Sequence, residues 1–298
     1  MEDQTAGPRA APAAPDRVWL VGCGAMGGAL AERWAAFGLG FPRLAIIDPA
    51  PRGPVPAGLR LLAAPADAAG LAPGPTAVVL AVKPQQLREA AQALAPWLVH
   101  PPLIVSVLAG VRLSTLAALL PGGRLVRAMP NLPARIGKGV TVLHAPALDA
   151  ADRAQAEWLF RTAGEVIWLD DETRFDAVTA LSGSGPAYVF RMIEAMAGAG
   201  EAAGLEAGLA ETLARMTVIG TAALAEAGGE SAAALRQQVT SPGGTTEAGL
   251  DALDGAGALS ALMRATVRAA SERARVLAAQ AEALLAEAEP PAREASAP

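Results

Sequence analysis

Two separated stretches of this 298-residue sequence combine the residue types that can hold a small anion. Residues 171–186 read DETRFDAVTALSGSGP, and residues 239–250 read VTSPGGTTEAGL. Each places Ser, Thr and Gly where a helix is expected to begin, and the first turn of a helix has backbone N–H groups without intrahelical partners. A carboxylate would suit such a place, so we expect the two stretches to contribute to one divided binding site.

The first stretch has two alternative interpretations. Residues 183–185, Gly-Ser-Gly, precede Pro186, which the first turn of a helix tolerates. A hydrolase nucleophile elbow would need glycine two residues before Ser184, where Ser182 stands, so that interpretation is not favoured. A simple Ser/Gly helix cap remains the alternative to an anion site.

A glycine loop near the N-terminus predicts a site for a dinucleotide. The apolar residues 17–22, RVWLVG, lead into Gly22, Gly24 and Gly27 in GxGxxG spacing, and an amphipathic helix is expected over 26–37. The first glycine permits a tight turn, the second lets a pyrophosphate approach, and the third lets the helix pack on the strand. A tight turn with a purely structural role is the alternative.

Asp48 bears on the choice of cofactor. It ends the run LAIID, about 20 residues after the last loop glycine, where this fold places an acid that binds a ribose 2′-OH. A carboxylate there would repel the 2′-phosphate of NADP and favours NADH. Arg52 follows closely and can pair with that phosphate, so NADPH and NADH both stay open.

Further apolar runs predict a parallel sheet. Residues 76–84 and 102–110 are continuous apolar runs, and RLVRAMPN, GVTVLHA and EVIWLDDE are additional strand candidates. The ends of such strands face the cofactor crevice. The positions of interest there are Lys83, Pro84, Ala109 and Asn131. For Lys83, a surface charge at a strand end is the alternative.

The spacing of apolar residues becomes helical after residue 187, and the helices are apolar over more than one narrow stripe. Such faces are expected to pair between subunits. The sequence therefore predicts an α/β fold, with an N-terminal Rossmann dinucleotide-binding domain over 17–170 and an all-helical dimerisation domain over 171–286. Residues 1–16 and 287–298 are expected to be disordered tails.

Composition excludes several classes of protein. A net charge of −5 argues against nucleic-acid binding. The single cysteine, Cys23, and the two histidines, His100 and His144, are too few for a zinc cluster or a His-based triad, so no metal is expected. We find neither a signal-peptide run nor a membrane-spanning run. A cytoplasmic protein with a small-molecule substrate is expected.

Six motifs, in this order and spacing, resemble pyrroline-5-carboxylate reductases, the last enzymes of proline synthesis. They are GCGAMG, AVKPQ, RAMPNLPARIGKGVT, DAVTALSGSGPAYVF, IEAMAGAGEAAGL and VTSPGGTTEAGL. The resemblance covers about residues 17–280, and its last two C-terminal motifs are specific to that family. It implies reduction of the cyclic imine 1-pyrroline-5-carboxylate to L-proline by NADPH or NADH. It also implies a homodimer unit, with a higher oligomer such as a decamer left open.

The resemblance also assigns residues. Ser184, Gly185, Thr245 and Thr246 would surround the bound acid. Thr246 would hydrogen-bond the ring nitrogen and assist its protonation, and Glu172 would reach the same nitrogen, where a carboxylate raises the pKa. Thr246 and Glu172 are thus the catalytic candidates. The cofactor residues would be Gly22, Gly24, Ala25, Met26, Gly27, Asp48, Ala81, Val82, Lys83, Pro84, Ala109 and Gln238.

Two segments depart from the family pattern. Asp48-Pro49 stands where many relatives place Ser or Asn with Arg, and GGESA at 228–232 replaces a segment with His-Pro.

The runner-up function is that of a β-hydroxyacid dehydrogenase or imine reductase. Hydroxyacid enzymes use a catalytic lysine in the second half of the chain, whereas Lys83 and Lys138 lie in the first half. A non-catalytic NAD(P)-binding regulator is disfavoured by the intact SGSGP and SPGGTT segments.

Overall fold

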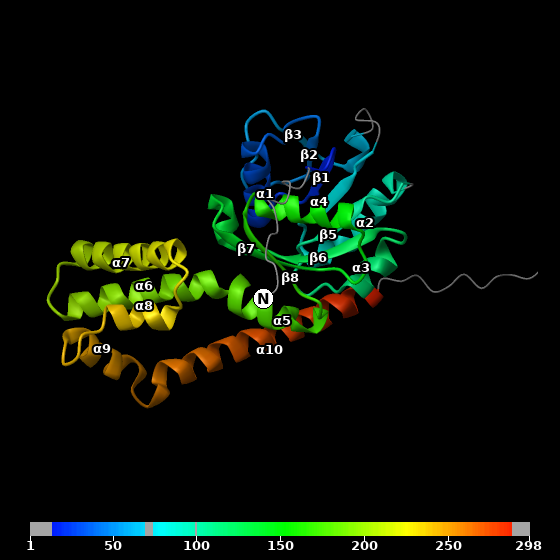
Figure 1. Cartoon of the computed structure of the whole chain (residues 1–298). Coiled ribbons are helices and arrows are strands. Elements are labelled where there is room, and N and C mark those ends of the chain that lie inside the picture. Colours follow the sequence, from blue (N-terminus) through cyan, green and yellow to red (C-terminus); the bar gives the residue numbers. More distant parts are fainter. Residues whose placement is uncertain (1–13, 69–73, 99, 288–298) are drawn as a thin grey trace, which may run out of the picture. The chain divides into compact units, whose positions relative to one another are not determined.

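The structure is a computed structural model that describes residues 14–68, 74–98 and 100–287. Contacts divide the chain into two compact units (Figure 1). The sheet unit comprises the chain up to Gly183 and again from Ser271, and the helical unit comprises Ser184–Ala270. The predicted domain boundary at residue 170 stays a prediction, and the expected tails lie almost wholly outside the described residues.

The sheet unit is built on one eight-stranded sheet in order β3-β2-β1-β4-β5-β6-β7-β8. The strands β1 to β6 are parallel, β7 runs antiparallel to β6, and β8 runs parallel to β7. The strands are β1 (Val18–Val21), β2 (Leu44–Ile47), β3 (Arg60–Leu62), β4 (Ala77–Leu80), β5 (Leu103–Ser106), β6 (Arg124–Met129), β7 (Gly139–His144) and β8 (Gly164–Trp168). This order confirms the Rossmann prediction, because its first six strands follow the dinucleotide-binding pattern.

Helices cover both faces of this sheet. Successive side chains of each buried strand point to opposite faces, so each face has its own hydrophobic core. Val18 and Leu20 of β1 face one core, to which α1 (Ala25–Ala36) and α4 (Ala150–Arg161) contribute. Trp19 and Val21 face the other, with α2 (Leu87–Leu94) and α3 (Leu113–Leu119) (Figure 1). Continuous apolar strands are the consequence, as the sequence predicted. The short strand β3 was missed, since only one of its residues is buried.

The glycine turn between β1 and α1 is fixed by its surroundings. Gly22 has φ +98°, and a Cβ there would lie 2.6 Å from the Ala81 carbonyl carbon. A Cβ on Gly27 would lie 2.2 Å from the Gly22 carbonyl oxygen. Packing alone therefore requires glycine at the first and third positions of the motif.

The segment after β8 is helical almost without a break. It comprises η5 (Glu172–Arg174), α5 (Phe175–Val178), the π-helical η6 (Thr179–Gly183) and α6 (Gly185–Ala202). Ser184 keeps helical angles of φ −85° and ψ −19°. The helix α6 begins within one residue of Pro186, which the sequence predicted for its first turn, and it follows a π-helical turn, a feature common at functional sites.

The helical unit contains α6, α7 (Ala207–Ala227), α8 (Ala232–Gln238), α9 (Thr245–Asp254) and the first part of α10 (Ala258–Glu287). Small residues let α6 and α7 approach closely, since a Cβ on Gly200 would lie 3.1 Å from the Ala210 Cβ. The end of α10 belongs to the sheet unit, where Arg275 pairs with Asp176 (3.7 Å) and Glu282 with Arg112 (3.2 Å). Among the described residues, no helix is long and apolar enough to cross a membrane.

Candidate active site

A cavity of about 330 Å³ lies at the carboxyl ends of β1, β2 and β4. This edge, at the point where the strand order reverses, is where Rossmann sheets bind their ligands. Among the residues that line the cavity are the predicted cofactor residues Gly22, Gly24, Asp48, Ala81, Val82 and Lys83. The structure therefore brings together positions from 22 to 83 of the sequence, and Arg52, which the sequence suggested for a 2′-phosphate, lines the same cavity.

The start of α1 suits a pyrophosphate. Gly24 is the N-cap and has no side chain with which to cap the first turn, in which Ala25 and Met26 lie. A Cβ at Gly24 would meet no protein atom within 4 Å. Packing therefore does not require this glycine, unlike Gly22 and Gly27, and the helix start is open to the approach of a ligand.

Asp48 holds the glycine loop as well as lining the cavity. Its Oδ2 accepts a hydrogen bond from the Cys23 N–H (2.6 Å), and its Oδ1 accepts one from the Ala50 N–H (2.8 Å). Each carboxylate oxygen can accept further hydrogen bonds, so a ribose hydroxyl remains a possible partner. The sequence predicted the ligand role of Asp48 and missed its bond to the loop.

The segment after Asp48 closes on the glycine loop. The Arg52 and Gly53 N–H groups donate to the Cys23 carbonyl oxygen at 3.0 and 2.7 Å. A Cβ on Gly53 would lie 2.1 Å from the Gly24 carbonyl oxygen, so only glycine fits there. Cys23 is buried, and burial is the main cause that raises the pKa of its thiol. The negative charges of Asp48 and Glu32 raise this pKa further. The thiol is therefore held protonated in the interior.

The predicted cofactor residue Ala109 lies between β5 and α3, at the same edge of the sheet. Ala109 is exposed. The next residue, Gly110, has φ +78°, and a Cβ there would lie 3.0 Å from the Ala278 Cα of α10. The loop is thus packed against the end of α10 on one side. Pro84 opens the short helix η2 (Pro84–Gln86) after Lys83.

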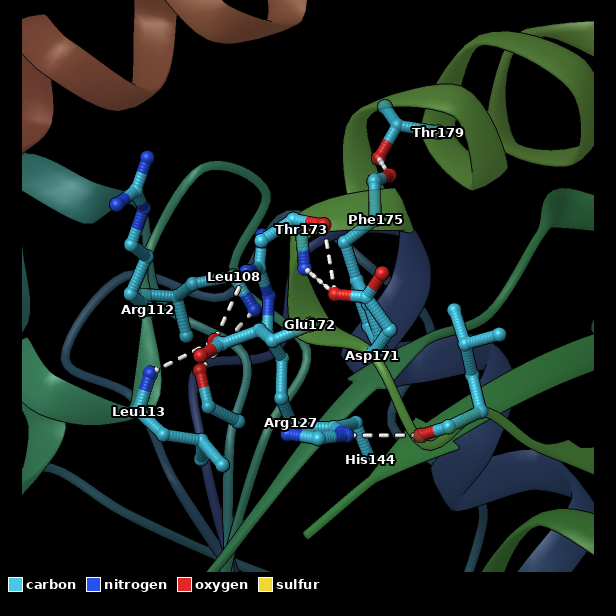
Figure 2. A network of polar contacts seen from close by, with 12 residues as sticks. Leu108, Arg112, Leu113, Arg127, His144, Asp171, Glu172, Thr173, Phe175 and Thr179 are labelled. Carbon is cyan, nitrogen blue, oxygen red and sulfur yellow. Dashed lines mark hydrogen bonds and ion pairs between the residues drawn. The ribbon is translucent and has the colours of Figure 1, made fainter. Parts of the chain in front are cut away.

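Glu172 lies in a network of polar contacts (Figure 2). Its Oε1 accepts hydrogen bonds from the Leu113 N–H and from the Arg127 Nη1, both at 2.9 Å. The Arg127 guanidinium also stacks over the Phe175 ring at 4.5 Å. The Glu172 carboxylate therefore has two hydrogen-bond partners within the protein. The sequence assigned this carboxylate to a substrate nitrogen and did not predict either partner.

The first stretch also meets the chain after β6. The Asn131 Nδ2 lies 3.4 Å from both the Oγ and the carbonyl oxygen of Ser182. A Cβ on Gly183 would lie 2.6 Å from the Met129 Cε. The sequence identified Asn131 as a strand-end position, but its contact with Ser182 depends on the fold. Ser184 and Gly185 follow directly, at the start of α6.

The second stretch forms the helix start that the sequence predicted. Gly244 is the N-cap of α9, has extended angles, and offers no side-chain cap to the first turn. Thr245 and Thr246 are the first residues of the helix, and both are exposed. The Glu247 Oε2 accepts a hydrogen bond from the Gly243 N–H (2.7 Å). The N–H groups of the two threonines therefore have no partner within the helix.

Gln238 is the last residue of α8, in the helical unit. Its Nε2 donates a hydrogen bond to the Glu230 Oε1 (2.6 Å). Glu230 lies in the segment GGESA, which departs from the family pattern. The predicted contact of Gln238 with a cofactor stays a prediction.

Two family models match the chain. The model described as pyrroline-5-carboxylate reductase dimerisation matches residues 172–277. The model described as NADP oxidoreductase, coenzyme F420-dependent, matches residues 17–110. The first match contains both Ser/Thr/Gly stretches apart from Asp171, and the second contains the glycine loop.

Individual relatives agree with these models. The chain is 45% identical over 205 residues to a pyrroline-5-carboxylate reductase of Pseudomonas aeruginosa, covering 68% of this chain and 75% of the relative. It is 43% identical over 201 residues to the Pisum sativum enzyme of that name, covering 67% and 73%.

Solved structures are similar too. A pyrroline-5-carboxylate reductase from Coxiella burnetii is 33% identical with a TM-score of 0.78, and the match covers 88% of this chain and 98% of that one. A Plasmodium falciparum pyrroline carboxylate reductase with NADP bound is 26% identical with a TM-score of 0.75 and the same coverage.

Proposed function

This chain belongs to the pyrroline-5-carboxylate reductase family, and we propose that it reduces 1-pyrroline-5-carboxylate to L-proline. The observation that carries the proposal is the family match over residues 172–277, which contains both helix starts assigned to the substrate. The reaction adds a proton to the nitrogen of a C=N bond and a hydride, supplied by the reduced dinucleotide when bound, to its carbon. The chain is thus an NAD(P)-dependent oxidoreductase.

The described residues fit a dinucleotide. The open helix start at Gly24 and the cavity at Asp48 would take the pyrophosphate and the adenosine ribose. Ala25, Met26 and Gly27 belong to that helix start, and Ala81, Val82, Lys83, Pro84 and Ala109 lie on loops at the same sheet edge. Arg52 and Lys83 supply positive charge at the cavity wall, whereas Asp48 supplies a negative one. The preference between NADH and NADPH depends on that balance.

The chemistry of the substrate requires binding more than it requires a strong base. A protonated C=N bond accepts hydride readily, so holding the reacting carbon in place supplies much of the rate. We assign Ser184, Gly185, Thr245 and Thr246 to the substrate carboxylate and ring. The Thr246 hydroxyl, on the first turn of α9, is assigned to hydrogen-bond the ring nitrogen and assist its protonation.

Glu172 was also assigned to the ring nitrogen, and that role stays a prediction. Its Oε1 already accepts hydrogen bonds from Arg127 and Leu113. A carboxylate that neutralises a neighbouring guanidinium has less charge to offer a substrate cation. These contacts support a different role for Glu172, that of positioning its neighbours.

We further propose a homodimer through the helical unit and a cytoplasmic location. Exposed apolar side chains on α6 and α7, among them Phe190, Leu213 and Met216, support pairing between copies. A single buried cysteine supports a reducing compartment. The decamer stays an open alternative for the complete assembly.

One experiment tests the reaction, the substrate and the cofactor together. The purified chain is mixed with 1-pyrroline-5-carboxylate and either NADH or NADPH, and loss of the reduced dinucleotide is followed by absorbance while proline is quantified. Stoichiometric proline formation is expected. Oxidation of 3-hydroxyacids without any reaction of pyrroline-5-carboxylate would favour the hydroxyacid dehydrogenase alternative instead.

A further inference from the structure

A buried arginine on β6 requires an explanation that the proposed reaction does not supply. The Arg127 side chain is only 5% exposed. An arginine cannot lose its proton inside a protein, so its charge needs a close partner. In the described structure its ion-pair partner is Glu172 at 2.9 Å, and the Phe175 ring lies under its guanidinium. The fold therefore depends on Glu172 to neutralise this buried charge.

The surroundings of this pair are ordered by the same contacts. His144 lies opposite Arg127 in the register of β6 and β7. Its Nδ1 lies 2.7 Å from the Leu169 carbonyl oxygen, and its ring packs edge-on against Phe175 (Figure 2). The Phe175 ring at the start of α5 thus contacts Arg127 of β6 and His144 of β7.

The pair also joins three segments that meet at the cofactor edge. Arg127 belongs to β6, and Glu172 opens η5, the beginning of the first Ser/Thr/Gly stretch. The Glu172 Oε1 also accepts the hydrogen bond of the Leu113 N–H, the first N–H of α3. Leu113 follows the loop that carries Ala109. A single carboxylate oxygen therefore connects the Ala109 loop, β6 and the first stretch.

We propose that Glu172 is a positioning residue. By neutralising the buried Arg127 and accepting the Leu113 N–H, it holds the Ala109 loop and the first stretch in register. The proposal rests on the proposed function, since that function gives the Ala109 loop its place beside the cofactor. In this role Glu172 acts through Arg127 and Leu113 and does not touch the reacting atoms. Its side chain is 23% exposed, and the described contacts use the oxygen that faces the protein.

A double-mutant cycle tests this role. Glu172→Gln leaves Arg127 buried without a counter-charge, whereas the double variant with Arg127→Met removes both charges and keeps a long side chain over Phe175. Each protein is assayed at 25 °C, where circular dichroism shows it folded, and its Tm is measured. Arg174→Gln is the matched control, because Arg174 lies in the same turn and its pair with Asp171 is exposed.

The expected result separates positioning from contact with substrate. Glu172→Gln should lower the Tm by roughly 5 to 10 °C and kcat about tenfold, and it should raise the KM for the dinucleotide severalfold, because the Ala109 loop lies in the proposed dinucleotide site. Adding Arg127→Met should restore most of both losses, since the unpaired charge is gone and the amide oxygen that Glu172→Gln leaves in place still accepts the Leu113 N–H. Arg174→Gln should change neither quantity.

Two results would overturn the proposal. Recovery of the Tm with kcat still low in the double variant would show that Glu172 acts on the reacting atoms. An unchanged Tm and kcat in Glu172→Gln would show that the contacts do not matter. If Glu172→Gln fails to fold, the double variant alone decides between these outcomes. An unmutated chain that does not reduce pyrroline-5-carboxylate would instead refute the proposed function, and the Tm cycle would still test the ion pair.

Discussion

Thr246 is the residue on which the proposed proton transfer depends. Its hydroxyl lies on the first turn of α9, where the backbone is fixed by the helix and the side chain is exposed. Thr246→Ala should lower kcat by about one to two orders of magnitude, the usual loss for a positioned proton donor. Steady-state kinetics with pyrroline-5-carboxylate measure this effect.

Two further variants make that prediction specific. Thr246→Ser keeps the hydroxyl and should retain most of the activity. Thr240→Ala, in the same stretch, removes a hydroxyl that only donates to the Arg236 carbonyl oxygen, and it should change kcat little. Equal turnover of Thr246→Ala and the unmutated chain would remove Thr246 from the mechanism.

Asp48 combines a ligand role with a structural one, and its substitution must separate the two. Asp48→Ser removes the charge together with both backbone hydrogen bonds, whereas Asp48→Asn keeps one acceptor for the Cys23 N–H. Both should raise kcat/KM for NADPH relative to NADH by about tenfold, because the repulsion of a 2′-phosphate is relieved. Asp48→Ser should lower the Tm more than Asp48→Asn, since it loses both backbone hydrogen bonds and not one.

The Arg52 side chain supplies the control for cofactor choice. If it pairs with the 2′-phosphate, Arg52→Gln in the Asp48→Asn background should cancel the gain in NADPH use. The two ratios are compared by steady-state kinetics with each dinucleotide. A ratio that does not respond to Asp48 would exclude it from cofactor selection.

The glycine turn shows, at the scale of one element, how glycines of one motif differ in role. Gly24→Ala adds a Cβ that meets no protein atom within 4 Å at ordinary backbone angles, so the Tm should stay the same. The methyl group should instead obstruct the pyrophosphate, at about 1–3 kcal/mol. The KM for the dinucleotide should therefore rise roughly ten- to a hundredfold.

Gly22→Ala is the contrasting variant in the same turn. Its Cβ would lie 2.6 Å from backbone at a positive φ, so the fold itself is strained. The Tm should fall by several degrees, as thermal unfolding would show. Equal Tm values for the two alanine variants would contradict the view that packing requires Gly22 and that Gly24 serves the approach of a ligand.

The first Ser/Thr/Gly stretch illustrates a limit of pattern reasoning for a single element. Its residues predicted a helix with Pro186 in the first turn, and α6 begins one residue earlier, at Gly185. The π-helical turn before it could not be predicted, because Gly183 approaches the Met129 side chain and Ser182 lies beside Asn131. Those neighbours come from the end of β6, far away in sequence.

The exposed apolar face of the helical unit is the proposed interface between copies of the chain. Leu209, Leu213 and Met216 of α7 are 48%, 49% and 57% exposed and lie on one side of the helix. Leu213→Glu would place a charge in an interface formed there, which is costly without a partner. Light scattering after size exclusion should give a multiple of the chain mass for the unmutated protein and a smaller mass for the variant.

Arg215→Gln controls for a change of helix surface alone. Arg215 is exposed and pairs with Glu211 one turn away, so its replacement should leave the assembly intact. A single-chain mass for the unmutated protein would contradict the homodimer. An unchanged assembly in Leu213→Glu would place the interface on another face.

The sequence by itself determined the features that depend on local spacing. The loop Gly22, Gly24 and Gly27, the buried parallel strands and the helical second half follow from patterns within short windows, where backbone geometry decides the outcome. Motif order was sufficient to indicate the family, which the comparisons confirm. The residue assignments themselves stay predictions.

Only the tertiary structure decided which groups share a partner. Asp48 meets the Cys23 N–H, and Gly53 meets the Gly24 carbonyl, because the carboxyl ends of the neighbouring strands β1 and β2 lie at one edge of the sheet. Glu172 follows β8 and meets Arg127 of β6 only once the sheet has assembled. A sequence pattern gives the type of each residue but not its neighbour across the sheet. The burial that forces Arg127 to find a counter-charge exists only after the strands have assembled.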